Sequence, residues 1–155
     1  MTTDKFTVVY QGDPKLFLGK NGSYLKFISG QPVMDSGLEN AVFISLFTRE
    51  GWAGNHLLRN RKYRIGSRFE ASLDEPIILQ TLNNARDEAA KALEWMIEGG
   101  LVGSIDISVT NPVGNQVSTS IQLHPPNMPI QNLLLVKNGV NWVFQIGNPA
   151  YQRGE

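Results

Sequence analysis

The sequence contains no cysteine and only two histidines among its 155 residues. The absence of cysteine excludes disulfide bonds, thiolate metal ligands and cysteine nucleophiles. His56 and His124 are far apart in the sequence, and neither a His-x-x-x-His pair nor an acidic calcium loop is present. We therefore expect no metal site and no cofactor. We expect His124, which precedes two prolines, to end a strand.

Neither sign of charge is in excess, since 14 basic and 14 acidic residues leave a net charge of zero. Whole-surface binding to nucleic acid or to an anionic membrane needs an excess of basic residues, so neither ligand is indicated. No apolar run approaches the roughly 20 residues of a membrane-spanning helix. Residues 1–5 carry no apolar secretion core, and we expect the chain to stay in the compartment where it is made.

Motifs for catalysis and phosphate binding are absent as well. The sequence has no Gly-x-Ser-x-Gly nucleophile motif and neither of the glycine-rich patterns that bind phosphate. Glycosidases use two carboxylates about 5 to 9 Å apart, but acidic side chains usually face solvent. The candidates for such a pair are Glu39, Glu50, Glu70, Asp74, Glu75 and Glu94. Solvated charge is the better interpretation of these residues, and we do not expect an enzyme.

The longest periodic pattern covers residues 73–100, where apolar residues recur every three or four positions. This spacing predicts an amphipathic helix with Pro76 in its first turn and its end at Gly99 or Gly100. The apolar stripe consists of Leu79, Leu82, Ala85, Ala89, Leu93, Met96 and Ile97. We expect this stripe to pack on the β-rich sequence that follows it.

A second helix is predicted after Ser36, which forms a capping-box pattern with Glu39. The residues that follow, up to Phe47, are apolar on nearly every side of a helix. Such a helix is either buried in its own domain or part of an interface, and we favour burial.

Strand patterns lie on both sides of these helices. Residues 6–10 and a hairpin around Asn21-Gly22 predict a small N-terminal β unit. Alternating residues 104–123 around a turn at 111–115 predict a hairpin, and residues 133–146 around Asn138-Gly139 predict another. Proline-rich residues 125–129 separate the two hairpins.

These patterns together predict an α+β fold, with two main helices packed on an antiparallel β-sheet and an additional small N-terminal β-hairpin unit. We expect residues 1–32 to form the N-terminal β-hairpin extension and residues 33–147 to form the core with its C-terminal hairpin. Residues 148–155 are expected to be a tail.

Residues 49–65 have no apolar period and are long for a connection in a compact domain. Trp52 stands between glycines, and the basic cluster Arg59, Arg61, Lys62 and Arg64 follows it. Tryptophan and arginine are frequent anchors of protein interfaces, so the segment is a candidate for docking on a partner. Two alternatives remain: Trp52 packs back on the core of a solvated loop, or the basic residues bind nucleic acid.

Four segments in order resemble the Mu-like phage tail protein family. They are residues 35–48 (DSGLENAVFISLFT), 51–54 (GWAG), 65–69 (IGSRF) and 85–100, which ends in LEWMIEGG. The resemblance covers about residues 33–124. It implies an α+β structural subunit of a contractile-tail baseplate wedge, related to the lysozyme-like small wedge protein of larger phages. Such a protein is located in the phage tail baseplate, and in the host cytoplasm during assembly.

The partners that this resemblance implies are other wedge proteins, tail tube or hub proteins and the sheath protein, in several copies around a sixfold tail, with no nucleic acid and no membrane span. Gly66-Ser67-Arg68 is similar to a Gly-Glu-Arg loop motif of the wider wedge group, which implies a contact role for Arg68, although Ser67 replaces the Glu. The expected partner-binding residues are Trp52, Arg59, Arg61, Arg64 and Arg68. The lysozyme-like label of the relatives leaves a peptidoglycan-cleaving tail enzyme as the alternative function.

Overall fold

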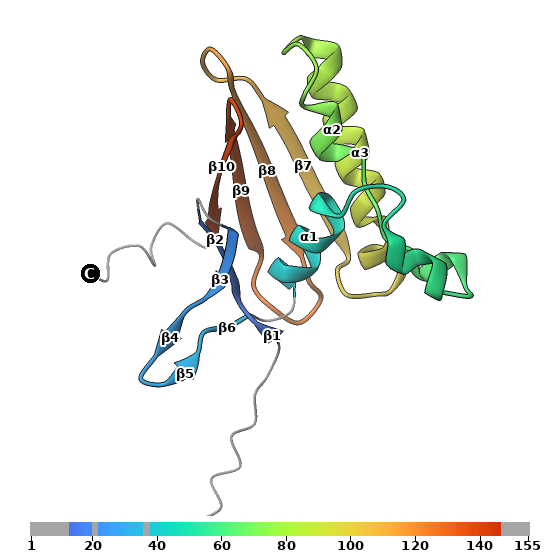
Figure 1. The fold of residues 1–155 in the computed structure, drawn as a ribbon, viewed down its shortest axis with the longest axis vertical. Helices are drawn as coiled ribbons and strands as arrows, with labels where there is room; N and C mark the ends of the chain where they lie inside the picture. Colours follow the sequence, from blue (N-terminus) through green and yellow to red (C-terminus); the bar gives the residue numbers. More distant parts are fainter. Residues whose placement is uncertain (1–12, 20–21, 36–37, 147–155) are drawn as a thin grey trace, which may run out of the picture. The chain divides into compact units, whose positions relative to one another are not determined.

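The computed structural model describes residues 13–19, 22–35 and 38–146, and the chain divides into two compact units, Met1–Ala41 and Val42–Glu155 (Figure 1). The boundary between the units falls within helix α1 (Leu38–Phe47). Four expectations lie outside the described residues. They are the strand at residues 6–10, the loop residues Lys20 and Asn21, the capping residue Ser36, and the tail at 148–155.

The first unit consists of short antiparallel strand pairs. They are β2 (Leu16–Gly19) with β3 (Gly22–Leu25), β4 (Phe27–Ile28) with β5 (Gln31–Pro32), and β1 (Asp13–Pro14) with β6 (Met34–Asp35). The hairpin expected around Asn21-Gly22 is confirmed, with Gly19 paired to Gly22. A second hairpin turns at Ser29 and Gly30, which both have positive φ angles.

The second unit contains a four-stranded antiparallel sheet in the order β10-β9-β8-β7. Its strands are β7 (Ser104–Thr110), β8 (Gln116–His124), β9 (Gln131–Asn138) and β10 (Asn141–Ile146). Both predicted hairpins are therefore confirmed, and the proline-rich segment connects β8 to β9. Gly139, with a φ of 60°, makes the turn between β9 and β10.

One face of this sheet is covered by helices. The register places Ile121 opposite Leu133 and Thr119 opposite Leu135, and all four side chains are buried on this face. Trp142 and Phe144 of β10 share the same face. The rings of Phe47 and Phe43 in α1 meet them edge to face, with centroids 5.1 and 5.0 Å apart. Helices α2 (Phe69–Ser72) and α3 (Leu79–Glu98) pack on one another, and α3 packs along β7 (Figure 1). The fold is α+β, as predicted.

Helix α3 begins three residues later than the sequence pattern predicts. Pro76 precedes the helix, and its carbonyl accepts a hydrogen bond of 2.6 Å from the Thr81 hydroxyl. This bond holds Thr81 inward, and the buried positions are Thr81, Ala85, Ala89, Leu93 and Met96. Leu79 and Ile97, both expected in the apolar stripe, are instead 74% and 43% exposed. The end of the helix is confirmed, since Gly100 has a φ of 73° and Leu101 N–H donates to the Met96 carbonyl (3.0 Å).

Helix α1 is largely buried, which confirms the favoured interpretation of its apolar sequence. Leu38, Val42, Phe43 and Leu46 are each less than a tenth exposed, whereas Ile44 is 47% exposed. None of the described helices is long and apolar enough to cross a membrane.

Candidate functional site: a basic surface lobe

Residues 51–66, here named the lobe, form a projection between α1 and α2. The lobe contains two 3₁₀ helices, η1 (Ala53–Leu57) and η2 (Arg61–Tyr63), and neither of them buries a residue. In these short 3₁₀ turns every side chain is at least partly exposed, so no face is buried and no regular spacing of apolar residues is needed. This explains why the sequence shows no period here.

The lobe begins and ends at a backbone junction, here named the neck, formed by residues 48–50 and 67–68. Arg49 and Ser67 form a parallel bridge, in which Ser67 N–H donates to the Thr48 carbonyl (2.8 Å) and Glu50 N–H donates to the Ser67 carbonyl (3.3 Å). Gly66 has a φ of 148°, and a Cβ there would lie 3.0 Å from the Cα of Glu50. Only glycine combines this backbone conformation with so close an approach.

A second connection closes the lobe above the neck. The side-chain amide of Asn55 donates to the carbonyl of Ile65 (2.5 Å), and Ile65 N–H donates back to the Asn55 carboxamide oxygen (2.9 Å). The asparagine therefore acts like a strand partner for Ile65. With both ends held, the lobe is a braced element rather than a freely moving loop.

Trp52 packs against the lobe itself. A Cβ at Gly54 would lie 2.1 Å from the Cη2 atom of Trp52, so the indole occupies the space where a side chain at position 54 would be. The indole is covered on this side by its own segment, and 48% of the residue stays exposed. Trp52 is thus held in a fixed position and remains available for contact.

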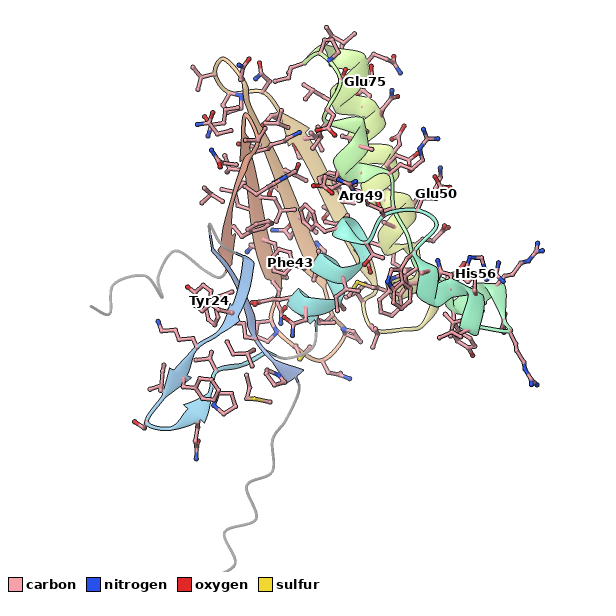
Figure 2. The ribbon with its side chains drawn as sticks, in the orientation of Figure 1. Tyr24, Phe43, Arg49, Glu50, His56 and Glu75 are labelled. Atoms are coloured by element: carbon pink, nitrogen blue, oxygen red, sulfur yellow. The ribbon has the colours of Figure 1, made fainter. Side chains whose placement is uncertain are left out.

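The charge on the lobe is all of one sign. Arg59, Arg61, Lys62 and Arg64 are exposed, no acidic residue occurs between positions 51 and 66, and none of the four forms an ion pair with any residue the structure describes. Figure 2 shows long side chains extending outward from the segment around the labelled His56. The lobe also exposes two large apolar residues, Leu57 (86% exposed) and Tyr63 (67%).

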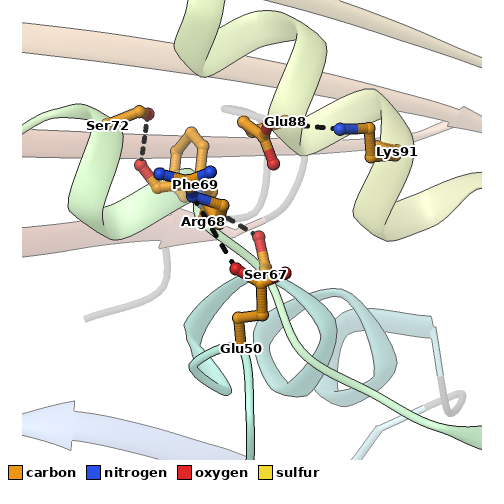
Figure 3. Close-up of polar contacts among 7 residues, drawn as sticks. All are labelled: Glu50, Ser67, Arg68, Phe69, Ser72, Glu88 and Lys91. Carbon is orange, nitrogen blue, oxygen red and sulfur yellow. Dashed lines mark hydrogen bonds and ion pairs between the residues drawn. The ribbon is translucent and has the colours of Figure 1, made fainter.

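The neck carries a separate set of charges. The guanidinium of Arg68 lies 3.7 Å from the Glu50 carboxylate, and that of Arg49 lies 3.7 Å from Glu70 (Figure 3 draws the first pair). The Ser67 hydroxyl accepts a hydrogen bond from Phe69 N–H (3.0 Å) at the start of α2. An open depression of about 280 Å³ is bordered by both ion pairs and by Ser67. Arg68 therefore lies at the base of the lobe, whereas Trp52, Arg59, Arg61 and Arg64 belong to the lobe itself.

The acidic residues considered for glycosidase chemistry are mostly matched to cations. Glu50 and Glu70 pair with arginines at the neck, and Asp74 accepts from Lys137 (2.8 Å). Glu39, in the first unit, pairs with Lys15 (2.8 Å). Glu75 and Glu94 are exposed. Among the described residues no group of three or more metal-ligating side chains occurs, and His124, which ends β8, contacts Asp106 (2.8 Å).

Two features of the lobe were not predicted from the sequence. Leu57 and Tyr63 are more exposed than Trp52, but a leucine or tyrosine in a polar segment carries no sign of its exposure. The bracing role of Asn55 was also missed, because its partner Ile65 is ten residues away. A Gly-Asn pair near a tryptophan indicates a turn, not the residue that the asparagine will hold.

The comparisons with known proteins place the chain in a phage family. Residues 38–129, more than half of the chain, match the model of the family described as Phage protein GP46. The chain belongs to this family. The Mu-like prophage FluMu protein gp46 of Haemophilus influenzae is 29% identical over 86 residues, which cover 52% of this chain and 62% of that protein. The chain thus spans less than two thirds of that relative's length. No solved structure is significantly similar.

The matched residues include the lobe, its neck and helices α1 to α3. The resemblance to a Mu-like phage family is therefore confirmed, and the chain is a phage protein. Neither the family description nor the relative's name specifies an enzyme.

Proposed function

We propose that this phage protein is a structural subunit of the baseplate wedge of a contractile tail and that it has no catalytic activity. In this role it links the central tube or hub region, the wedge scaffold and the first sheath ring, in several copies around a sixfold tail. The observation that carries the proposal is the braced, basic lobe on a compact α+β body.

The lobe has the properties of a docking element. Its ends are joined through Ser67, and Asn55 holds Ile65, so little conformational entropy is lost when it binds. Its exposed side chains are of the types that anchor interfaces, namely tryptophan, tyrosine and arginine. A rigid body with a preorganised projection suits a baseplate subunit that must hold neighbouring proteins in fixed positions when force acts on the tail.

The arrangement of the carboxylates supports the absence of catalysis. Hydrolysis of a glycosidic bond needs two carboxyl groups about 5 to 9 Å apart, one of which holds a proton for the leaving group. Glu50, Glu70 and Asp74, the acids that border the depression at the neck, each face a basic side chain. Structural ion pairs account for these residues.

The location of the chain in the particle tests the structural role. Tails purified from cells that produce the phage should contain the chain in a fixed ratio to the sheath protein, and cryo-electron microscopy should locate it at the baseplate end. Deletion of its gene should yield particles without a complete baseplate, and the unaltered gene supplied on a plasmid should restore them. Complete particles that lack the chain would overturn the proposal.

A cell-wall lysis assay tests the enzymatic alternative. Suspended, permeabilised cells should keep their turbidity when the purified chain is added, and the variants Glu39→Gln and Glu94→Gln should behave in the same way. Lysis by the unaltered chain that either substitution abolishes would identify an enzyme and contradict the structural role as the sole function.

A further inference from the structure

We propose that the lobe docks on a different tail protein whose facing surface is acidic and contains a shallow apolar recess for Leu57 and Tyr63. This inference rests on the proposed structural role, and it adds the chemistry of the partner and the residues that recognise it. The lobe includes four of the 14 basic residues of a chain whose net charge is zero.

The cations of the lobe have no counter-charge in their own surroundings. Arg59, Arg61, Lys62 and Arg64 lie within six consecutive residues without an acid among them. Elsewhere in the described residues, most lysines and arginines are paired: Lys26 has no ion pair, but each of the others lies within 4.0 Å of a carboxylate, namely Lys15, Arg49, Arg68, Arg86, Lys91 and Lys137. Like charges held together in a braced segment repel one another, and an acidic partner relieves this repulsion.

The three arginines favour carboxylates as the opposing groups. A guanidinium presents its donors as a planar fork that matches a carboxylate with two parallel hydrogen bonds. The exposed Leu57 and Tyr63 belong to the same lobe and bring apolar surface to it. Protein interfaces commonly combine apolar residues at their centre with polar and charged residues around them, and the lobe offers both kinds.

A nucleic acid fits the lobe less well. Four phosphate contacts provide modest affinity that falls steeply with salt, and Leu57 has no counterpart on a phosphate backbone. At the neck, Arg49 and Arg68 already face carboxylates, so an extended polyanion that continued past the lobe would meet no unpaired cation among the described residues there. A small acidic patch on a folded protein can contact the four cations of the lobe and need not extend to the neck.

A second copy of this chain also fits less well, because it offers few free acids. Most of its described carboxylates already face a cation, and the exposed acids without an ion pair in the described part are Glu75, Glu94 and Glu98. Glu75 precedes α3, and the other two lie near its end, about 30 Å away at 1.5 Å per helical residue. At most two adjacent acids would therefore face four cations.

Photo-crosslinking within assembled particles tests the partner. A photoreactive phenylalanine derivative at position 57, and separately at 63, should form a cross-link to another tail protein at a peptide rich in Asp and Glu. The same derivative at Val140, which lies in the turn between β9 and β10 and is at least as exposed (90%) as either test position, should not cross-link to that peptide. Cross-links to nucleic acid, to a second copy of this chain, or to a peptide without acids would overturn the inference, as would particles with no cross-link at either position.

Charge reversal provides a second measurement. Arg61→Glu with Lys62→Glu should lower the number of copies per particle by about tenfold. The matched control, Arg86→Glu with Lys91→Glu on α3, changes the net charge equally and should be incorporated normally. Equal incorporation of both variants would contradict the inference while leaving the structural role intact, whereas an unaltered chain absent from particles would remove the structural role itself.

Discussion

The carboxamide of Asn55 holds the backbone of Ile65, ten positions further along the chain, through hydrogen bonds in both directions. This contact and the bridge between Arg49 and Ser67 close the lobe at two levels. The segment from Asn55 to Ile65 therefore keeps its conformation without burying a side chain in the core. A projection built in this way can be stable while its surface stays free for a partner.

Replacing Asn55 by alanine should open the lobe without unfolding the protein. The variant loses both bonds to Ile65, each worth about 1 kcal/mol, and amide hydrogen exchange at Ile65 should accelerate by about tenfold or more. The midpoint of urea unfolding should change little, because the lobe contributes no side chain to the core.

Asn60→Ala serves as the control for this experiment, since the one hydrogen bond of the Asn60 side chain within the described part of the chain is accepted from Lys62 N–H in η2. Exchange at Ile65 should be unaffected by this substitution. Equal acceleration in both variants would mean that Asn55 does not brace the lobe.

Gly66→Ala should destabilise the protein by about 2 to 3 kcal/mol, because the φ of 148° is unfavourable for alanine and the neighbouring atoms of Glu50 and Arg49 are backbone. Gly51→Ala is the matched comparison. Gly51 also has a positive φ, 81°, but nothing lies within 4 Å of its Cβ position, so its substitution should cost only about 1 kcal/mol. Urea denaturation of both variants measures the difference, and equal losses would show that close approach at the neck is unimportant.

The polar contact of Lys137 inside the second unit makes a further prediction. Lys137 is 8% exposed, and its ammonium group donates to the Leu73 carbonyl (3.0 Å) and to Asp74 (2.8 Å). Lys137→Ala should cost about 2 to 3 kcal/mol, since it leaves a carbonyl without its donor and removes a packed stem.

Asp74→Ala should cost about 1 kcal/mol or less, because this carboxylate is 71% exposed and solvent screens the pair. The free energies of unfolding in urea compare the two. A larger loss for Asp74→Ala than for Lys137→Ala would mean that the ion pair, and not the buried donor, provides the stability.

Local patterns predicted most of the second unit. Alternation in 104–110 and 116–124, and the Asn138-Gly139 turn, indicated strands that the structure confirms, because one face of the sheet is buried and the period of two is visible in the chain. The predicted start of α3, with Pro76 in the first turn, was wrong. Proline is compatible with a first turn, but here the Pro76 carbonyl accepts hydrogen bonds from the Ile78 N–H (2.9 Å) and the Thr81 hydroxyl (2.6 Å), and the helix begins at Leu79.

Contacts between distant residues could not be predicted. Lys137 continues an apolar strand pattern, but its burial depends on Leu73 and Asp74, more than sixty positions earlier. The sequence indicated which lobe residues could bind a partner, since tryptophan and arginine cluster there. It carried no sign of the bracing by Asn55 or of the ion pairs at the neck, since these depend on how the chain folds back on itself.

Replacing Trp52 and Arg68 together by alanine should leave a folded chain that no longer joins the wedge. Trp52 is 48% exposed and Arg68 has a side chain that is 70% exposed, so the circular dichroism spectrum should be unchanged and the loss of stability about 1 kcal/mol. The comparison variant, Trp95→Ala with Arg86→Ala, removes a tryptophan of similar exposure (41%) on α3 and an arginine beside Asp87. Co-purification with the other wedge proteins should be lost for the first variant and kept for the second. If the first variant also co-purifies, the interface lies elsewhere on the molecule.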